Sequence, residues 1–213
     1  MDGGNVSVSV ASWGSPVKRD EEQKRRRAAE VRACAHELEE HGRLGLTRGF
    51  IQHGDVTVYA HVTSVALASL AIADALARAG IRVDRASLTR GALLHDYFLY
   101  DWHVPDPSHR LHGFTHPFTA LRNAEADFDL TKRERNIIVR HMFPLVPIPP
   151  ACREAWIVSM ADKFCALRET VVGRLPGHGR GRGQGDGTGA AGRGHSASAG
   201  ATGCGIGANG TCA

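Results

Sequence analysis

Apolar residues recur at three- and four-residue steps through most of this chain, from about Arg19 to Val172. Side chains at this spacing share one face of an α-helix, which can be buried against other helices. Segments with the two-residue alternation of a β-strand are weak throughout. The pattern therefore predicts an all-α domain over residues 19–172.

Start and stop signals divide this region into helices. Thr131 and Glu134 have the spacing of a capping box, and Pro117 suits the first turn of a helix, where its missing N–H costs no hydrogen bond. Gly80 is a natural helix end. The predicted helices are Asp20–Glu40, Asp55 or Thr57 to about Ala79, Asp84 or Ser87 to the pair His95-Asp96, a segment opened by Pro117, Thr131 to Met142, and Cys152 to about Thr170.

The end of the chain has a different composition. Residues 173–213 contain more than half of the 25 glycines and almost no large apolar side chain. Ordering such a segment costs much backbone entropy, so we expect a disordered tail, and residues 1–18 are expected to be a flexible N-terminus. Two interpretations of the tail stay open: weak contact with RNA, or an appendage without function, as a shifted reading frame would produce. Few arginines and no interleaved aromatic residues favour the second.

Charge and cysteine content narrow the class of protein. The tail supplies +3 of the formal net charge of +4, so the helical region is close to neutral and nucleic acid is expected at most at the tail. The five cysteines include no Cys-x-x-Cys pair, which favours reduced thiols over a disulfide framework or zinc cage. We see no secretory signal and no apolar stretch sufficient for a membrane span, so a cytoplasmic protein without a membrane partner is expected.

Six polar side chains are predicted to lie on helix faces that are otherwise apolar. They are His61, the adjacent His95 and Asp96, His116, His141 and Asp162. Burying an imidazole or a carboxylate without a partner costs on the order of several kcal/mol, so such residues pair or bind metal. Any one of them alone is better explained as a hydrogen-bonded core residue or a helix cap. Together, on successive helices, they predict a shared site.

The order of these residues resembles the HD-domain superfamily of metal-dependent phosphohydrolases. The motifs are a histidine in one helix (VYAHVTSVALASLAIADAL), a His-Asp pair ending the next (ALLHDYF) and an aspartate in a late helix (IVSMADKFCALRE), and the resemblance covers about residues 51–169. Each motif alone is weak, and their order and helical context make the match specific. The resemblance implies an HD-domain helical bundle and four metal ligands, His61, His95, Asp96 and Asp162.

Two further histidines extend the resemblance. His116 (THPFTAL) and His141 (IIVRHMF) fall where members with two metal ions carry extra ligands, so Asp96 would bridge the ions and be catalytic. Such ions, roughly 3.5–4 Å apart, activate a shared water and hold the oxygens of a phosphoryl transfer. Imidazole and carboxylate ligands suit Mn, Fe, Co, Ni or Zn. The implied activity is hydrolysis of a phosphate ester or anhydride of a small, nucleotide-like substrate by metal-activated hydroxide, with one or two divalent transition metal ions as cofactor.

The chain departs from two branches of the superfamily. Tyr97 and Phe98 follow the His-Asp pair, where the cyclic-di-GMP phosphodiesterase branch has a glycine and a lysine, and that branch's GYP signature is missing. Leu99 stands where nucleotidase-like members place a catalytic carboxylate. Asp101 is the nearest acidic residue, and two roles stay open for it: orienting the attacking water, or capping the next turn.

Few residues are candidates for binding the substrate. Lys163, beside Asp162, and Arg140, beside His141, are predicted to bind phosphate, because cations next to a metal site meet phosphoryl oxygens; solvated surface charges are the alternative. A zinc-like spacing is also shared by three histidines, His109, His112 and His116.

Two other functions would use the same pocket. A non-catalytic nucleotide or metal sensor is favoured by the missing lysine and carboxylate after the His-Asp pair. A di-iron oxygenase of the HD type would use the same six ligands, and nothing outside those ligands argues for it.

Overall fold

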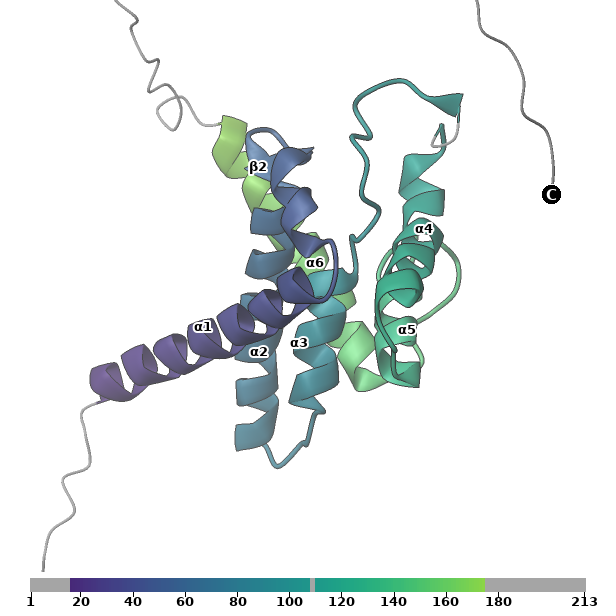
Figure 1. Ribbon diagram of the computed structural model, residues 1–213. Coiled ribbons are helices and arrows are strands. Elements are labelled where there is room, and N and C mark those ends of the chain that lie inside the picture. The colour runs from purple at the N-terminus through teal and green to yellow at the C-terminus, as the bar shows by residue number, and fades with distance from the viewer. Residues whose placement is uncertain (1–15, 108–109, 175–213) are drawn as a thin grey trace, which may run out of the picture. The chain divides into compact units, whose positions relative to one another are not determined.

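Six α-helices make up most of the residues that the structure, a computed structural model, describes, which are 16–107 and 110–174. A 3₁₀-helix, η1 (Leu44–Gly49), and a small antiparallel hairpin of β1 (Ile51–His53) and β2 (Val56–Thr57) join the first helix to the second. The helices are α1 (Pro16–Glu40), α2 (Val58–Arg78), α3 (Arg85–Leu94), α4 (His112–Asp127), α5 (Lys132–Arg140) and α6 (Arg153–Arg174). The prediction of an all-α fold is confirmed (Figure 1).

The described residues all belong to the first of two structural units, Met1–Gly179. Predictions for the ends of the chain fall mainly outside the described residues: the disordered tail from residue 175 onward and the flexible N-terminus up to residue 15. Within the predicted N-terminal segment, α1 already begins at Pro16, four residues before the expected start of this helix. Three cysteines are described, and Cys34, Cys152 and Cys165 are free thiols.

Capping side chains start three helices where the sequence predicts. The Thr57 side chain accepts a hydrogen bond from the first turn of α2, and Asp84 does the same for α3. Thr131 and Glu134 form the predicted capping box of α5. These contacts lie within four residues of chain, which is why local sequence determines them.

The start of α4 differs from the prediction. The helix begins at His112, so Pro117 lies inside it and does not open it. A proline near a helix start leaves one early carbonyl without its usual partner, a small loss for the whole helix. Two side chains stabilise this start: Thr115 Oγ1 donates to the Leu111 carbonyl oxygen at 3.0 Å, and the Nδ1 of His116 lies 2.8 Å from the His112 carbonyl oxygen.

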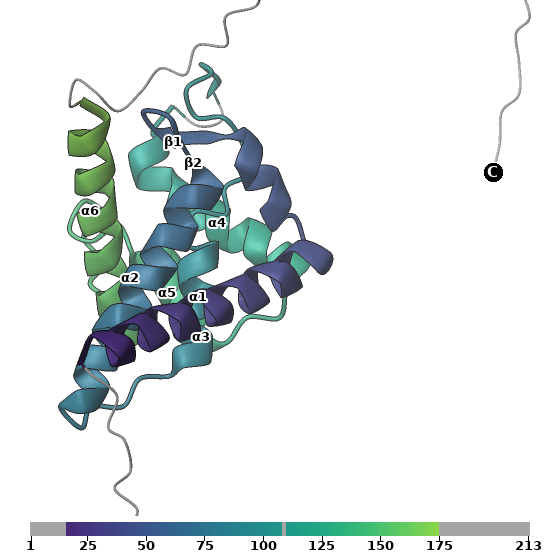
Figure 2. The ribbon, with the colours of Figure 1, turned by 90° about the vertical axis from the view of Figure 1, so that its left-hand side faces the viewer.

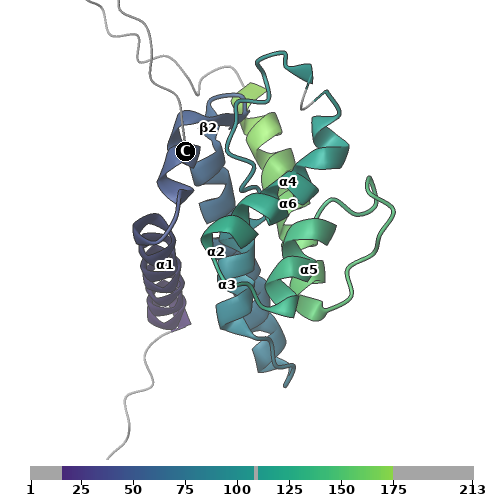
Figure 3. The same ribbon diagram turned by 45° about the vertical axis from the view of Figure 1, so that its right-hand side comes forward.

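The core forms where α2, α3, α5 and α6 pack together. α2 packs against α3 and α6, and α5 packs against α3, α4 and α6. α1 lies across α2 and α3 (Figure 2), and α4 and α5 lie on the other side of that pair (Figure 3). Gly91 in α3 allows the approach of α5, because a Cβ there would lie 2.5 Å from Cδ1 of Ile137. The ends of α3 and α5 are thereby brought together.

The helix α2 is long and apolar enough to cross a membrane by length and composition alone, contrary to the expectation that every apolar stretch falls short. In the structure it packs against α1, α3 and α6. Its buried residues include the polar His61 and Ser69. Core helices with this composition pass the same test.

Candidate metal centre

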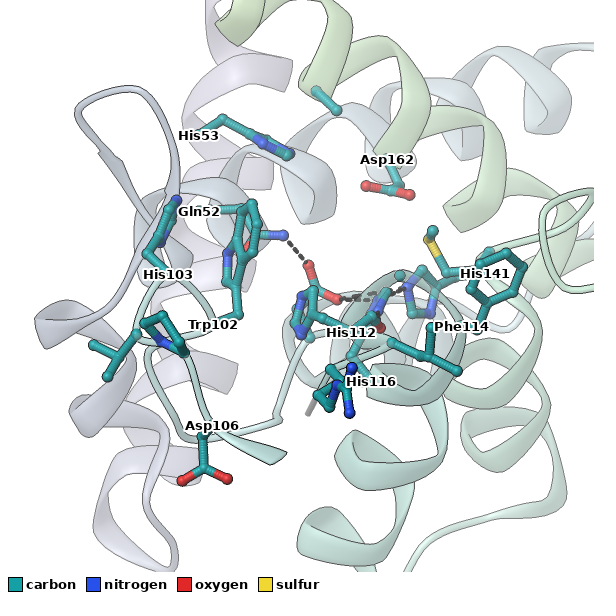
Figure 4. Close-up of a pocket in the computed structure, with 18 of the residues that line it drawn as sticks. Gln52, His53, Trp102, His103, Asp106, His112, Phe114, His116, His141 and Asp162 are labelled. Atoms are coloured by element: carbon teal, nitrogen blue, oxygen red, sulfur yellow. Dashed lines mark hydrogen bonds and ion pairs between the residues drawn. The ribbon is translucent and has the colours of Figure 1, made fainter. Parts of the chain in front are cut away.

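The structure brings all six predicted ligands together from five helices, and all six are buried. Figure 4 shows His116, His141 and Asp162 around the cavity that they line. His61 lies in the first turn of α2, His95 and Asp96 directly follow α3, His116 is in α4, His141 directly follows α5, and Asp162 is in α6.

Two sets of hydrogen bonds and one backbone turn hold the segment after the His-Asp pair. The side-chain amide of Asn123 donates to the carbonyl oxygens of Tyr97 and Phe98, both at 3.0 Å. The Tyr97 hydroxyl donates to Asp127 Oδ2 at 2.7 Å. Leu99 has a left-handed backbone conformation, with φ of 59°, which turns the chain away from the axis of α3. His95 and Asp96 are therefore held at the end of α3, and the helix does not continue beyond them.

In all four histidines of the site, the protein holds the same ring nitrogen, Nδ1. Each Nδ1 lies within hydrogen-bond distance of an oxygen that only accepts, so each Nδ1 carries a proton and a neutral ring has its lone pair on Nε2. Metal-binding histidines are oriented in this way. The partners are Glu169 Oε2 for His61 (2.9 Å) and the carbonyl oxygens of Ala92 for His95 (2.7 Å), His112 for His116 (2.8 Å) and Ile138 for His141 (2.8 Å).

One set of side chains surrounds Oδ2 of Asp96. We call His61, His95, Asp162 and this oxygen the first ligand group. The Nε2 of His61 lies 3.1 Å from Asp162 Oδ1, and the Nε2 of His95 lies 3.3 Å from Asp96 Oδ2. Two atoms bound to one ion at about 2.1 Å lie about 3.0 Å apart at a right angle and about 3.4 Å apart at the tetrahedral angle. The first ligand group therefore has the spacing of ligands to one cation.

The other oxygen of the same carboxylate faces a second set. The second ligand group is Asp96 Oδ1 with His116 and His141, whose Nε2 atoms lie 3.2 Å and 3.5 Å from that oxygen. The two Nε2 atoms are 2.9 Å apart. Burial lowers the pKa of His141 to about 3, so this ring is neutral and its Nε2 cannot donate. The Nε2 of His141 therefore presents a lone pair toward His116, and a cation bound by both rings would replace this contact with two bonds.

Charge and hydrogen bonding in the cluster fit a cation. The His95 Nε2 and Asp96 Oδ1 atoms are buried without a hydrogen-bond partner. Burial opposes ionisation of Asp96, but the neighbouring imidazoles of His95 and His116 outweigh it and hold the pKa of Asp96 well below its usual range. Buried carboxylates that stay ionised need compensating positive charge. Two sets of these side chains could therefore hold a metal ion: His61 with His95 and Asp162, and His95 with Asp96 and His141.

Sequence reasoning missed two residues that orient the ligands. Gln52 Nε2 donates to Asp96 Oδ2 at 2.7 Å, and Glu169 accepts from His61. Burial alone would lower the pKa of His61, but hydrogen bonds to Asp162 and Glu169 raise it to about 9. Glu169 follows Asp162 by seven residues, about two helical turns, and that spacing was a usable signal. No spacing in the sequence pointed to Gln52, because β1 and the end of α3 come together only in the folded protein.

The two predicted phosphate-binding residues differ in position. Lys163 lines the cavity, and its ammonium group lies 2.8 Å from the His141 carbonyl oxygen, 3.1 Å from the Ser159 carbonyl oxygen and 3.0 Å from Ser159 Oγ. Arg140 donates to the carbonyl oxygen of Pro149 at 2.7 Å and is not among the described residues that line the cavity.

Asp101, the predicted catalytic acid, lies in the loop after α3. Its carboxylate accepts from the backbone N–H of His103 at 3.0 Å, which is the geometry of a residue that caps a turn. Asp101 does not line the described part of the cavity. The zinc-like spacing of three histidines includes His109, which lies outside the described residues, so that alternative stays a prediction.

A cavity of about 1050 Å³ opens next to both ligand groups. Asp96, His116, His141 and Asp162 lie on one side of it, and the loop after α3 and the start of α4 form another wall (Figure 4). Cavities of this size hold small organic ligands. The candidate metal ligands are therefore accessible to a substrate, although their side chains are buried.

Comparisons with protein-family models, with curated proteins and with solved structures find no match for this chain. The resemblance to the HD-domain superfamily therefore rests on the sequence motifs alone and stays a prediction.

Proposed function

We propose that this protein is a metal-dependent phosphohydrolase of the HD type, which uses two divalent transition metal ions to cleave a phosphate ester or anhydride of a small substrate. One observation carries the proposal: the two oxygens of a single buried carboxylate, Asp96, face two separate sets of imidazole Nε2 atoms. A structural histidine cluster needs no such division, whereas a carboxylate that bridges two ions requires it.

Each residue of the site then has a distinct role. Two ions held by Asp96 would lower the pKa of a shared water and offset charge on the phosphoryl oxygens. Glu169 and the backbone carbonyls hold the imidazoles, and Gln52 holds Asp96. Lys163 adds positive charge at the cavity wall. In the reaction the water oxygen bonds to phosphorus, the bond from phosphorus to the leaving oxygen breaks, and that oxygen takes a proton from the water.

The first test combines metal content with phosphate release on the full chain. Protein loaded with Mn²⁺ should contain two ions and release phosphate from at least one member of a panel of phosphomonoesters and nucleotides. Asp96→Asn should lose both properties, and Asp101→Asn, on the exposed loop, should keep the metal. Activity with redox-inert Zn²⁺ would exclude the di-iron oxygenase. Two bound ions without phosphate release from any substrate would overturn the hydrolase and favour the sensor or, with iron and oxygen consumption, the oxygenase.

A further inference from the structure

One wall of the cavity is apolar, and this bears on the substrate. The loop after α3 and the first turns of α4 supply it. Figure 4 shows Trp102, from this loop, and Phe114, from α4, among the residues that line the cavity. The apolar lining residues of this wall are Trp102, Val104, Pro105, Pro107, Leu111 and Phe114.

Three of these side chains are exposed although they are apolar. The exposed fraction is 57% for Val104, 64% for Leu111 and 48% for Phe114. Apolar side chains that gather around one opening mark ligand-binding sites, because a ligand that covers them removes apolar surface from water. The wall therefore favours an apolar group on the ligand.

Positive charge is sparse at the same wall. Lys163 and Arg110 are the cationic side chains that line the described part of the cavity. The ammonium group of Lys163 has three donors, and three oxygen atoms lie within hydrogen-bond distance of it. Asp106 adds a carboxylate to the lining. A nucleoside triphosphate needs cations along all its phosphates, and among the described residues of this wall Arg110 is the one that carries a full positive charge.

We propose that the substrate is a phosphate monoester with one phosphoryl group and an apolar remainder that lies against Phe114, Leu111 and Trp102. This inference rests on the proposed hydrolase and narrows the nucleotide-like substrate that the resemblance implies.

The test compares esters of similar primary alcohols, so that leaving-group reactivity is matched. With Mn²⁺-loaded full-length protein, kcat/KM is measured for 2-phenylethyl phosphate, ethyl phosphate and AMP, and for ATP as the polyphosphate. We expect 2-phenylethyl phosphate to exceed each of the other three at least about tenfold, the scale of one apolar group in a pocket.

Two variants on α4 test whether the apolar wall causes the preference for 2-phenylethyl phosphate. Phe114→Ser should lower kcat/KM for 2-phenylethyl phosphate about tenfold, mainly through KM, and leave ethyl phosphate within about twofold. Phe118→Ser is the matched control, because Phe118 lies one turn further along α4, is 47% exposed and does not line the cavity. Circular dichroism and thermal melting check the fold of both variants.

The outcomes separate the two proposals. If AMP or ATP is cleaved as well as 2-phenylethyl phosphate, or if Phe114→Ser and Phe118→Ser behave alike, the apolar substrate is wrong and the hydrolase stands. If metal-loaded protein releases phosphate from none of the four compounds nor from the wider panel, the hydrolase fails, and this inference fails with it.

Discussion

The two ligand groups share Asp96 but differ in charge. The first ligand group contains a second carboxylate, Asp162, and a third, Glu169, stands behind His61. The second ligand group has only the shared oxygen of Asp96, and neutral backbone carbonyls hold both of its imidazoles. A divalent cation is therefore attracted more strongly to the first group than to the second. We expect the first site to fill first and the second to fill at higher metal concentration.

The largest expected effect comes from the residue that both ligand groups share. Asp96→Asn keeps the shape of the side chain but takes the shared charge from both groups. It should lower metal affinity at both sites and phosphate release by at least about a hundredfold. Isothermal titration with Mn²⁺ and an activity assay measure this. Loss of only one ion would show that Asp96 does not bridge.

Substitutions within single groups should separate the sites. His116→Ala should reduce the content from two ions to one and leave the affinity of the remaining ion within about threefold. Asp162→Ala should weaken the first, tighter binding event about a hundredfold, because it removes a carboxylate ligand. Mass spectrometry of the native protein counts the ions. Equal losses in both variants would contradict the ranking of the two groups.

A substitution at Glu169 should change metal affinity at the first ligand group alone, although Glu169 is not itself a proposed metal ligand. Glu169→Gln weakens the hold on His61 Nδ1, so affinity at the first ligand group should fall about ten- to a hundredfold while the second group changes little. The exposed Glu37→Gln, on α1, is the control. A uniform loss at both sites would indicate a general loss of stability.

The two groups should also differ in their response to pH. The pKa of His61 is raised to about 9 and that of His95 is also raised, so below pH 9 protons at both rings compete with the first ion, and its affinity should rise about ten- to a hundredfold per pH unit between pH 7 and 9. The pKa of His141 is lowered to about 3, so no proton competes at this ring in that range. Titration in buffers of different ionisation enthalpy counts the protons released. Proton release only with the second ion would reverse the assignment.

The smallest effects are expected at the two predicted phosphate-binding residues. Lys163→Met should raise KM several-fold, since Lys163 lines the cavity, while Arg140→Ala should change KM less than about twofold. Steady-state kinetics with the best substrate of the panel measure both. A larger effect at Arg140 would show that the loop around Pro149 reaches the substrate.

Much of the fold followed from local sequence, and the shared site of six side chains followed from polar residues on apolar helix faces. Thr57, Asp84 and the Thr131–Glu134 pair start helices because their side chains bond within the next turn. His61 was a candidate because a buried imidazole on an otherwise apolar helix stripe needs a partner, and several such residues on successive helices indicate a shared site.

The features that could not be predicted from the sequence depend on contacts between segments that are far apart in the chain. The position of a carboxylate one turn beyond the His-Asp pair has meaning only if the helix continues, but α3 ends at Leu94 and Leu99 turns the chain. The early start of α4 and the contact from Gln52 to Asp96 likewise depend on packing between elements far apart in the chain.

The most direct test of the central claim is a crystal structure of the Mn²⁺-loaded protein with an anomalous difference map. We predict two peaks roughly 3.5–4 Å apart, with one oxygen of Asp96 bound to each ion. A single peak that Asp96 binds through one oxygen, or no peak between the six side chains, would contradict a carboxylate-bridged pair of metal ions.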